Sequence, residues 1–167
     1  MLPKIKLVFR FCNWLNWAGC IVYVFAVGLM TMFPAKFLAA FSKAFTPGGA
    51  ELTLQTFQGI AILIIPTTYA AHRIFGAIRA IIDSAIAGNP FAGHNALLLR
   101  TIGWALLAIQ ILDLAAGFLL VRFSDATGEY WGWSAALTGW LAALLMFVLA
   151  RIFEHGAQLR DDLDGTI

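Results

Sequence analysis

Four long stretches of the chain contain almost no charged side chains. Three of them carry no charge at all, namely residues 11–35, 52–71 and 130–150. The fourth, residues 101–121, is interrupted only by Asp113. Each stretch has about 20 residues or more, the length that crosses a hydrocarbon core of about 30 Å as an α-helix. The pattern therefore predicts four membrane-spanning helices.

The polar residues between these stretches set the boundaries of the predicted fold. We expect an all-α protein, a four-helix transmembrane bundle that forms one integral membrane domain over residues 1–167. The spans are expected at about residues 11–35, 52–80, 98–121 and 130–153.

Composition supports lipid as the solvent of these helices. Hydrophobic residues make up 61% of the chain and charged residues 12%, whereas soluble domains carry about 25% charged residues. The mean hydropathy is +0.83. The net charge of +2 comes without a long run of Lys or Arg, so we expect membrane lipid as a partner and no direct contact with nucleic acid.

The distribution of lysine and arginine predicts the orientation. Cytoplasmic segments carry the excess of these residues, so we expect both termini in the cytoplasm. Eight basic residues belong to the two ends and the second connection: Lys4, Lys6, Arg10, Arg73, Arg79, Arg100, Arg151 and Arg160. The other side has three: Lys36, Lys43 and Arg122.

The second and fourth helices are predicted to extend beyond the membrane into the cytoplasm. A helix from residue 52 to residue 87 is about 54 Å long, far more than the hydrocarbon core. In its excess, Arg79 and Asp83 have the spacing of a weak helical ion pair. We expect Arg73 or Arg79 to face Glu154 or Asp161 of the fourth helix. At the start of the third helix, Asn95 is a plausible N-cap.

Asp113 is the residue whose position most needs an explanation. A carboxylate at the bilayer centre costs about 2.5–3.5 kcal/mol, so such a side chain normally faces other helices and has a partner there. We expect a buried, protonated carboxyl with neutral partners. The candidate set of this intramembrane polar site is Asp113, Gln110, Thr67, Thr68 and Tyr23. A structural hydrogen bond, a proton or cation site and a contact to another protein's helix remain open.

The sequence offers no pattern of an enzyme or of a metal site. His72, His94 and His155 lack metal-ligand spacing, and Cys12 and Cys20 show no motif. A metal or haem between His72 and His155 is conceivable, although interfacial polar roles are the preferred interpretation. We expect no cofactor, no metal and no catalytic residue.

Two sequence motifs accompany the four-span layout. One surrounds the second connection and combines Asn89-Pro90-Phe91, Asn95-Ala96, Leu99-Arg100 and Ile102-Gly103-Trp104. The other is C-terminal and combines Arg151-Ile152-Phe153, Gly156-Ala157, Leu159-Arg160, Asp162-Leu163 and Gly165-Thr166-Ile167. With these motifs the chain resembles a family of small bacterial four-helix inner-membrane proteins of unknown function. The resemblance implies the four-helix fold. Members of that family are commonly encoded beside a small helix-turn-helix regulator, which suggests a partner.

The placement of charges and motifs favours a regulatory or interaction protein that docks a cytoplasmic partner, such as a small transcription regulator. An accessory subunit of a larger membrane complex is the first alternative. A protein that binds or transports a small molecule or ion through Asp113 is the second. The expected cytoplasmic interaction surface comprises Arg79, Asp83, Asn89, Phe91, Asn95, Arg100, Glu154, Arg160 and Asp162.

Overall fold

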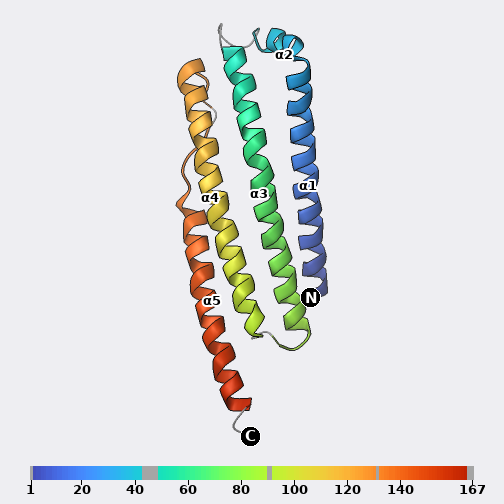
Figure 1. Ribbon diagram of the computed structural model, residues 1–167, viewed down its shortest axis with the longest axis vertical. Helices are drawn as coiled ribbons and strands as arrows, with labels where there is room; N and C mark the ends of the chain where they lie inside the picture. The colour runs from blue at the N-terminus through green and yellow to red at the C-terminus, as the bar shows by residue number, and fades with distance from the viewer. Residues whose placement is uncertain (1, 43–48, 90–91, 131, 165–167) are drawn as a thin grey trace. The chain divides into compact units, whose positions relative to one another are not determined.

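The computed structural model describes residues 2–42, 49–89, 92–130 and 132–164, without the side chains of residue 3 and residues 160–164. Within these residues the chain forms five α-helices and no strand (Figure 1). This confirms the all-α class. The helices are α1 (Leu2–Met32), α2 (Pro34–Phe41), α3 (Gly49–Ile86), α4 (Gly93–Thr127) and α5 (Leu137–Asp164).

Four of these helices are long and apolar enough to cross a membrane, as the hydropathy pattern predicts. They are α1, α3, α4 and α5, and by length and composition they make the chain a multi-pass membrane protein. The excess of helical length is not confined to the second and fourth spans. At about 1.5 Å per residue, the 35 residues of α4 extend about 52 Å, almost as far as the 38 residues of α3.

The first span ends earlier than expected, because the chain breaks at Phe33. Phe33 has non-helical backbone angles (φ −125°, ψ 56°), and Pro34 begins α2 directly after it. Proline favours the first position of a helix, since its ring presets φ and its missing N–H leaves no donor unpaired there. The predicted span 11–35 therefore consists of most of α1 and the start of a second, short helix.

Pro66 does not interrupt α3. The helix is continuous from Gly49 to Ile86 although Pro66 donates no hydrogen bond. The neighbouring Thr67 hydroxyl donates to the carbonyl oxygen of Leu63 at 2.8 Å, one residue beyond the carbonyl that Pro66 leaves without its usual donor.

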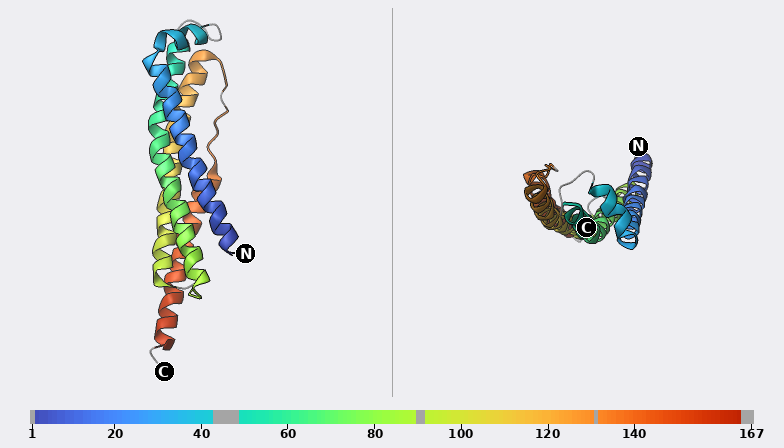
Figure 2. Two further views of the ribbon diagram at one scale, coloured as in Figure 1. Left: turned by 90° about the vertical axis from the view of Figure 1, so that its right-hand side faces the viewer. Right: turned by 90° about the horizontal axis from the view of Figure 1, so that it is seen from above.

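The fourth span begins later than predicted. We expected residues 130–153 to be helical, but α5 begins at Leu137, and the described residues from 128 to 136 are not helical. Figure 2 shows the described part of this segment as coil after α4. Gly128 ends α4 with a positive φ of 75°, and its N–H donates to Ser124 at 2.8 Å. Gly132 also has a positive φ of 44°, a conformation that a helix cannot contain.

The chain divides into two compact units. The first comprises residues 1–16, 69–110 and 136–167, and we call it the basic unit. The second comprises residues 17–68 and 111–135. Helices α1, α3 and α4 each contribute to both units.

Charge separates these two units. The basic unit holds the eight Lys and Arg residues named above, with the five acidic residues Asp83, Glu154, Asp161, Asp162 and Asp164. The second unit holds the other three basic residues, with the four acidic residues Glu51, Asp113, Asp125 and Glu129.

Small side chains allow the helices of the basic unit to pack closely. Its core contains Ala77 of α3, Leu99 and Ile102 of α4, and Ala150 of α5, whose side chain is fully buried. Ala residues let helix backbones approach closely and so increase their dispersion contacts. In a bilayer such contacts drive helix association, because burying a helix face there displaces lipid and not water. In the second unit, the largest fully buried side chain is Phe123.

Candidate functional site

In the basic unit, an ion pair joins the start of α1 to the end of α3. The Lys6 ammonium donates to both carboxylate oxygens of Asp83, at 2.6 and 2.9 Å. The predicted pair between Arg79 and Asp83 is therefore wrong. Arg79 instead donates from Nε to the carbonyl oxygen of Phe75 at 3.2 Å. Asp83 therefore pairs with Lys6 of the neighbouring helix α1 and not with Arg79 in the preceding turn of α3.

A second contact between α1 and α3 involves a histidine. Nδ1 of His72 lies 3.0 Å from the side-chain oxygen of Asn13. His155 is exposed on α5. Within the described part of the chain, no three side chains among His, Cys, Asp and Glu gather closely enough to hold a metal ion. The geometry of His72 is that of a polar contact between helices.

Asn95 joins α3 to α4, and its predicted role as a cap is wrong. Helix α4 begins at Gly93, before Asn95. The Asn95 side chain is fully buried, and its amide donates to the Ser84 hydroxyl at 2.6 Å. Its backbone N–H donates to Ala92 at 2.8 Å. A buried amide that reaches another helix fixes how the two helices face one another.

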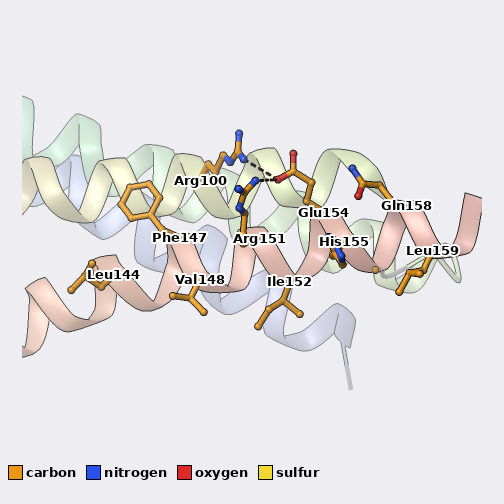
Figure 3. Close-up of a pocket in the computed structure, with 11 residues that line it drawn as sticks. Arg100, Leu144, Phe147, Val148, Arg151, Ile152, Glu154, His155, Gln158 and Leu159 are labelled. Atoms are coloured by element: carbon orange, nitrogen blue, oxygen red, sulfur yellow. Dashed lines mark hydrogen bonds and ion pairs between the residues drawn. The ribbon is translucent and has the colours of Figure 1, made fainter.

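Glu154 binds two arginines, neither of them predicted. Its carboxylate accepts from Arg100 of α4 at 2.9 Å, and Arg151 of α5 lies 3.6 Å away (Figure 3). We expected Arg73 or Arg79 to face Glu154 or Asp161, and the side chain of Asp161 lies outside the described residues. The Arg73 guanidinium instead donates to the Tyr69 hydroxyl within α3, at 3.3 Å.

These two arginines border an open groove of about 1220 Å³ along α5. The groove has an apolar part, formed by leucine, valine, isoleucine and phenylalanine side chains, and a polar part around Glu154. Figure 3 shows most of its lining residues along one length of α5, with Arg100 reaching in from α4. The lining residues are Arg100, Leu144, Phe147, Val148, Arg151, Ile152, Glu154, His155, Gly156, Gln158 and Leu159.

The predicted interaction surface is only partly assembled. Asp83 and Asn89 are exposed at the end of α3 and in the following turn, and Asn89 donates its N–H to Ser84 at 3.0 Å. Asn95 is buried and offers no surface. Arg100 of α4 and Glu154 of α5 meet at the groove. Phe91 and the side chains of Arg160 and Asp162 lie outside the described residues.

The predicted intramembrane site does not form around Asp113. Asp113 is exposed, and its carboxylate accepts from the indole N–H of Trp133 at 3.3 Å. The other members of the predicted site have different contacts. Tyr23 donates to the Phe57 carbonyl oxygen at 3.3 Å, and the Thr67 hydroxyl donates within its own helix.

The remaining two members of that predicted site lie in α3 and α4. Thr68 is buried in α3. Gln110 lies against Gly139 in the basic unit, where a methyl group on Gly139 would overlap its amide. The partner that Asp113 does have, Trp133, was not predicted. Its signal was available, because a buried or lipid-facing indole N–H normally seeks an acceptor.

Comparison with curated proteins and with solved structures found no match. A family model does match residues 37–167, which include α3, α4, α5 and most of α2 but not α1. The matched part contains both predicted motifs, the buried Asn95–Ser84 contact and the two arginines at Glu154. The chain therefore belongs to DUF2975, a family of proteins of unknown function.

Proposed function

We propose that this protein is a non-catalytic membrane protein whose basic unit faces the cytoplasm and binds a cytoplasmic protein there. The observation that carries the proposal is the coincidence of structure and charge. The basic unit contains eight of the eleven Lys and Arg residues. An excess of these residues marks the cytoplasmic side of multi-pass proteins.

The docking surface would be the end of the α1–α3–α4 group, formed by residues 83–86 of α3 and residues 87–89 that follow it. Ile86 is an exposed apolar side chain there, 50% accessible, beside the exposed Asp83 and Asn89. The Lys6–Asp83 and Asn95–Ser84 contacts hold this end of α3 against both neighbouring helices. A surface that is already ordered loses less conformational entropy when a partner binds.

The motifs around the second connection and at the C-terminus resemble those of a family whose members are commonly encoded beside a small helix-turn-helix regulator. This resemblance suggests a small transcription regulator as the partner. Such a protein would be held at the membrane by the basic unit and released when the contact is broken. Binding of this kind requires an ordered surface and no catalytic group. The Lys6–Asp83 and Asn95–Ser84 contacts of the basic unit supply that order.

Site-specific photocrosslinking in living cells tests the proposal. A photoreactive residue at position 89 should give an adduct with one soluble cytoplasmic protein, while the same residue at position 126 in the second unit should not. Ile86→Asp should abolish the adduct, because a charge replaces the exposed apolar contact. Ala126→Asp is the matched control and should leave it unchanged. Absence of any soluble adduct from position 89 would count against the proposal.

A second candidate, an accessory subunit of a membrane complex, is favoured by Asp113. Its side chain is exposed on α4 within an otherwise uncharged stretch of 21 residues. Exposure of a carboxylate to lipid near the bilayer centre is costly. A helix of another subunit could cover it. Purification in mild detergent should then yield a larger complex that Asp113→Leu disrupts, whereas a lone monomer excludes this role.

A further inference from the structure

The groove along α5 combines two kinds of surface at one end of a membrane span. Its apolar part includes Leu144, Val148 and Ile152, which recur every four residues and so lie on one face of the helix. Their side chains are 60%, 55% and 58% exposed. On a helix that crosses a membrane, an exposed apolar stripe of this kind is in contact with acyl chains.

The polar part of the groove has an excess of hydrogen-bond donors. Arg100 and Arg151 both approach the single carboxylate of Glu154. Each guanidinium has five N–H donors in a planar fork, so one carboxylate cannot use them all. Arg151 in particular has a side chain that is 81% exposed. Arginine forks match the geometry of phosphate oxygens, to which they bind in a bidentate manner.

The two arginines border uncharged stretches of their helices. Arg151 is the first charged residue after the uncharged stretch 130–150, and Arg100 is the last one before the stretch 101–112. Charged side chains at such positions lie at the membrane interface. Basic pockets between spanning helices on the cytoplasmic side are recognised binding places for anionic lipid headgroups.

We infer that the groove binds one anionic phospholipid of the cytoplasmic leaflet. Its phosphate takes the free donors of Arg151 and Arg100, and one acyl chain follows Val148 and Leu144. The volume of about 1220 Å³ exceeds the roughly 300–1,000 Å³ typical of small-molecule pockets, as a ligand with long chains requires. This inference goes beyond the proposed function, because the proposed docking surface at Ile86 is not part of the groove.

Retention of lipid by the purified full-length protein tests the inference. The protein is mixed in detergent with equal amounts of phosphatidylglycerol and phosphatidylcholine, and native mass spectrometry counts the lipids that stay bound. The wild type should retain one phosphatidylglycerol in preference to phosphatidylcholine. Arg151→Ala should weaken this retention about fivefold, the effect of removing one basic residue at a membrane surface.

Three further variants make the result specific. Arg151→Lys keeps the charge and should keep most of the preference, while Glu154→Gln removes the competing carboxylate and should strengthen retention. Arg122→Ala is the matched control, since Arg122 is exposed in the second unit and stacks on Phe118 at 5.9 Å. Circular dichroism checks that every variant stays helical.

Four outcomes would overturn the inference. One is equal retention of the two lipids by the wild type, and another is unchanged retention in Arg151→Ala. The third is an equal loss in Arg122→Ala, because lipid would then respond to total charge and not to the groove. Retention of no lipid, with a protein helix bound in its place, would also reject it.

Discussion

At the scale of single residues, the buried Asn95 shows how one polar side chain sets the packing of two helices. Its amide donates to Ser84 across the α3–α4 contact, and no part of the side chain is accessible. Truncation leaves the Ser84 hydroxyl without that donor and creates a void, so the contact is costly to remove although its net strength is modest.

Asn95→Ala should therefore lower the free energy of unfolding by about 1–3 kcal/mol. Unfolding of the purified protein in mixed detergent micelles, followed by circular dichroism, measures the change. His94→Ala is the control in the same turn, since His94 is exposed and should change stability by less than about 0.5 kcal/mol. Equal stabilities of the two variants would contradict the role given to Asn95.

Gly117 is a second residue at which the packing makes a sharp prediction. The indole of Trp133 occupies the place where a Cβ atom would lie. Gly117→Ala must displace Trp133, and with it the hydrogen bond to Asp113, which should cost about 1–3 kcal/mol. At Gly28 a Cβ meets nothing within 4 Å, so Gly28→Ala should be neutral or stabilising. Thermal unfolding in detergent compares the two, and a Gly117→Ala protein as stable as Gly28→Ala would refute the contact.

The indole N–H of Trp133 signals that an acceptor is needed, but the sequence does not say which one, because an apolar helix does not reveal its rotation. Between residues 102 and 121 the polar side chains of α4 are Gln110 and Asp113, so no polar stripe indicates which face Asp113 occupies. The sequence shows which charged residues lie near the helix ends, but it does not show how they pair. Glu154 binds Arg100 and not Arg73 or Arg79. The choice among several arginines at one depth depends on helix rotation and neighbour order, which hydropathy leaves open.

At the scale of elements, the segment before α5 departs most from the predicted fold. Residues 130–136 carry no charge and include three aromatic side chains, and for that reason they were assigned to the fourth span. The backbone N–H groups of residues 132–136 donate no hydrogen bond to any other described residue. Irregular backbone at membrane depth persists only where protein or water satisfies it. We therefore expect water around this segment in the isolated protein, which a second subunit covering Asp113 would exclude.

Cysteine labelling distinguishes hydrated backbone from a lipid-facing helix. In a protein whose Cys12 and Cys20 are replaced by alanine, Ser134→Cys should react with a water-soluble maleimide. Leu141→Cys should not, although Leu141 is 64% exposed, because it lies on α5 and faces lipid. Protection of both positions would mean that the fourth span begins near residue 130, as its hydropathy indicates.

The number and rough position of the long helices followed from the sequence, and their ends did not. Apolar length determines that a helix spans the membrane, and this is why α1, α3, α4 and α5 were expected. The end of α1 at Phe33 and the start of α5 depend on local backbone chemistry, at Pro34 and at Gly128 and Gly132. Hydropathy averages over about 19 residues and cannot resolve such signals.

At the scale of the whole molecule, charge and compact structure divide the chain at the same places. The eight basic residues of the basic unit come from three separate segments of the sequence, brought together by α1, α3, α4 and α5. Both proposals depend on this unit being cytoplasmic: the docking surface at Ile86 needs a soluble partner, and the groove at Arg151 needs the anionic leaflet.

Sided labelling of two single-cysteine variants tests this orientation most directly. Ala126 and Gln158 are both exposed, one in the second unit and one in the basic unit. In intact spheroplasts, a membrane-impermeant maleimide should label Ala126→Cys at once and Gln158→Cys only after the membrane is permeabilised. Immediate labelling of Gln158→Cys, or labelling of both variants from the same side, would contradict the membrane-spanning arrangement and the cytoplasmic basic unit together.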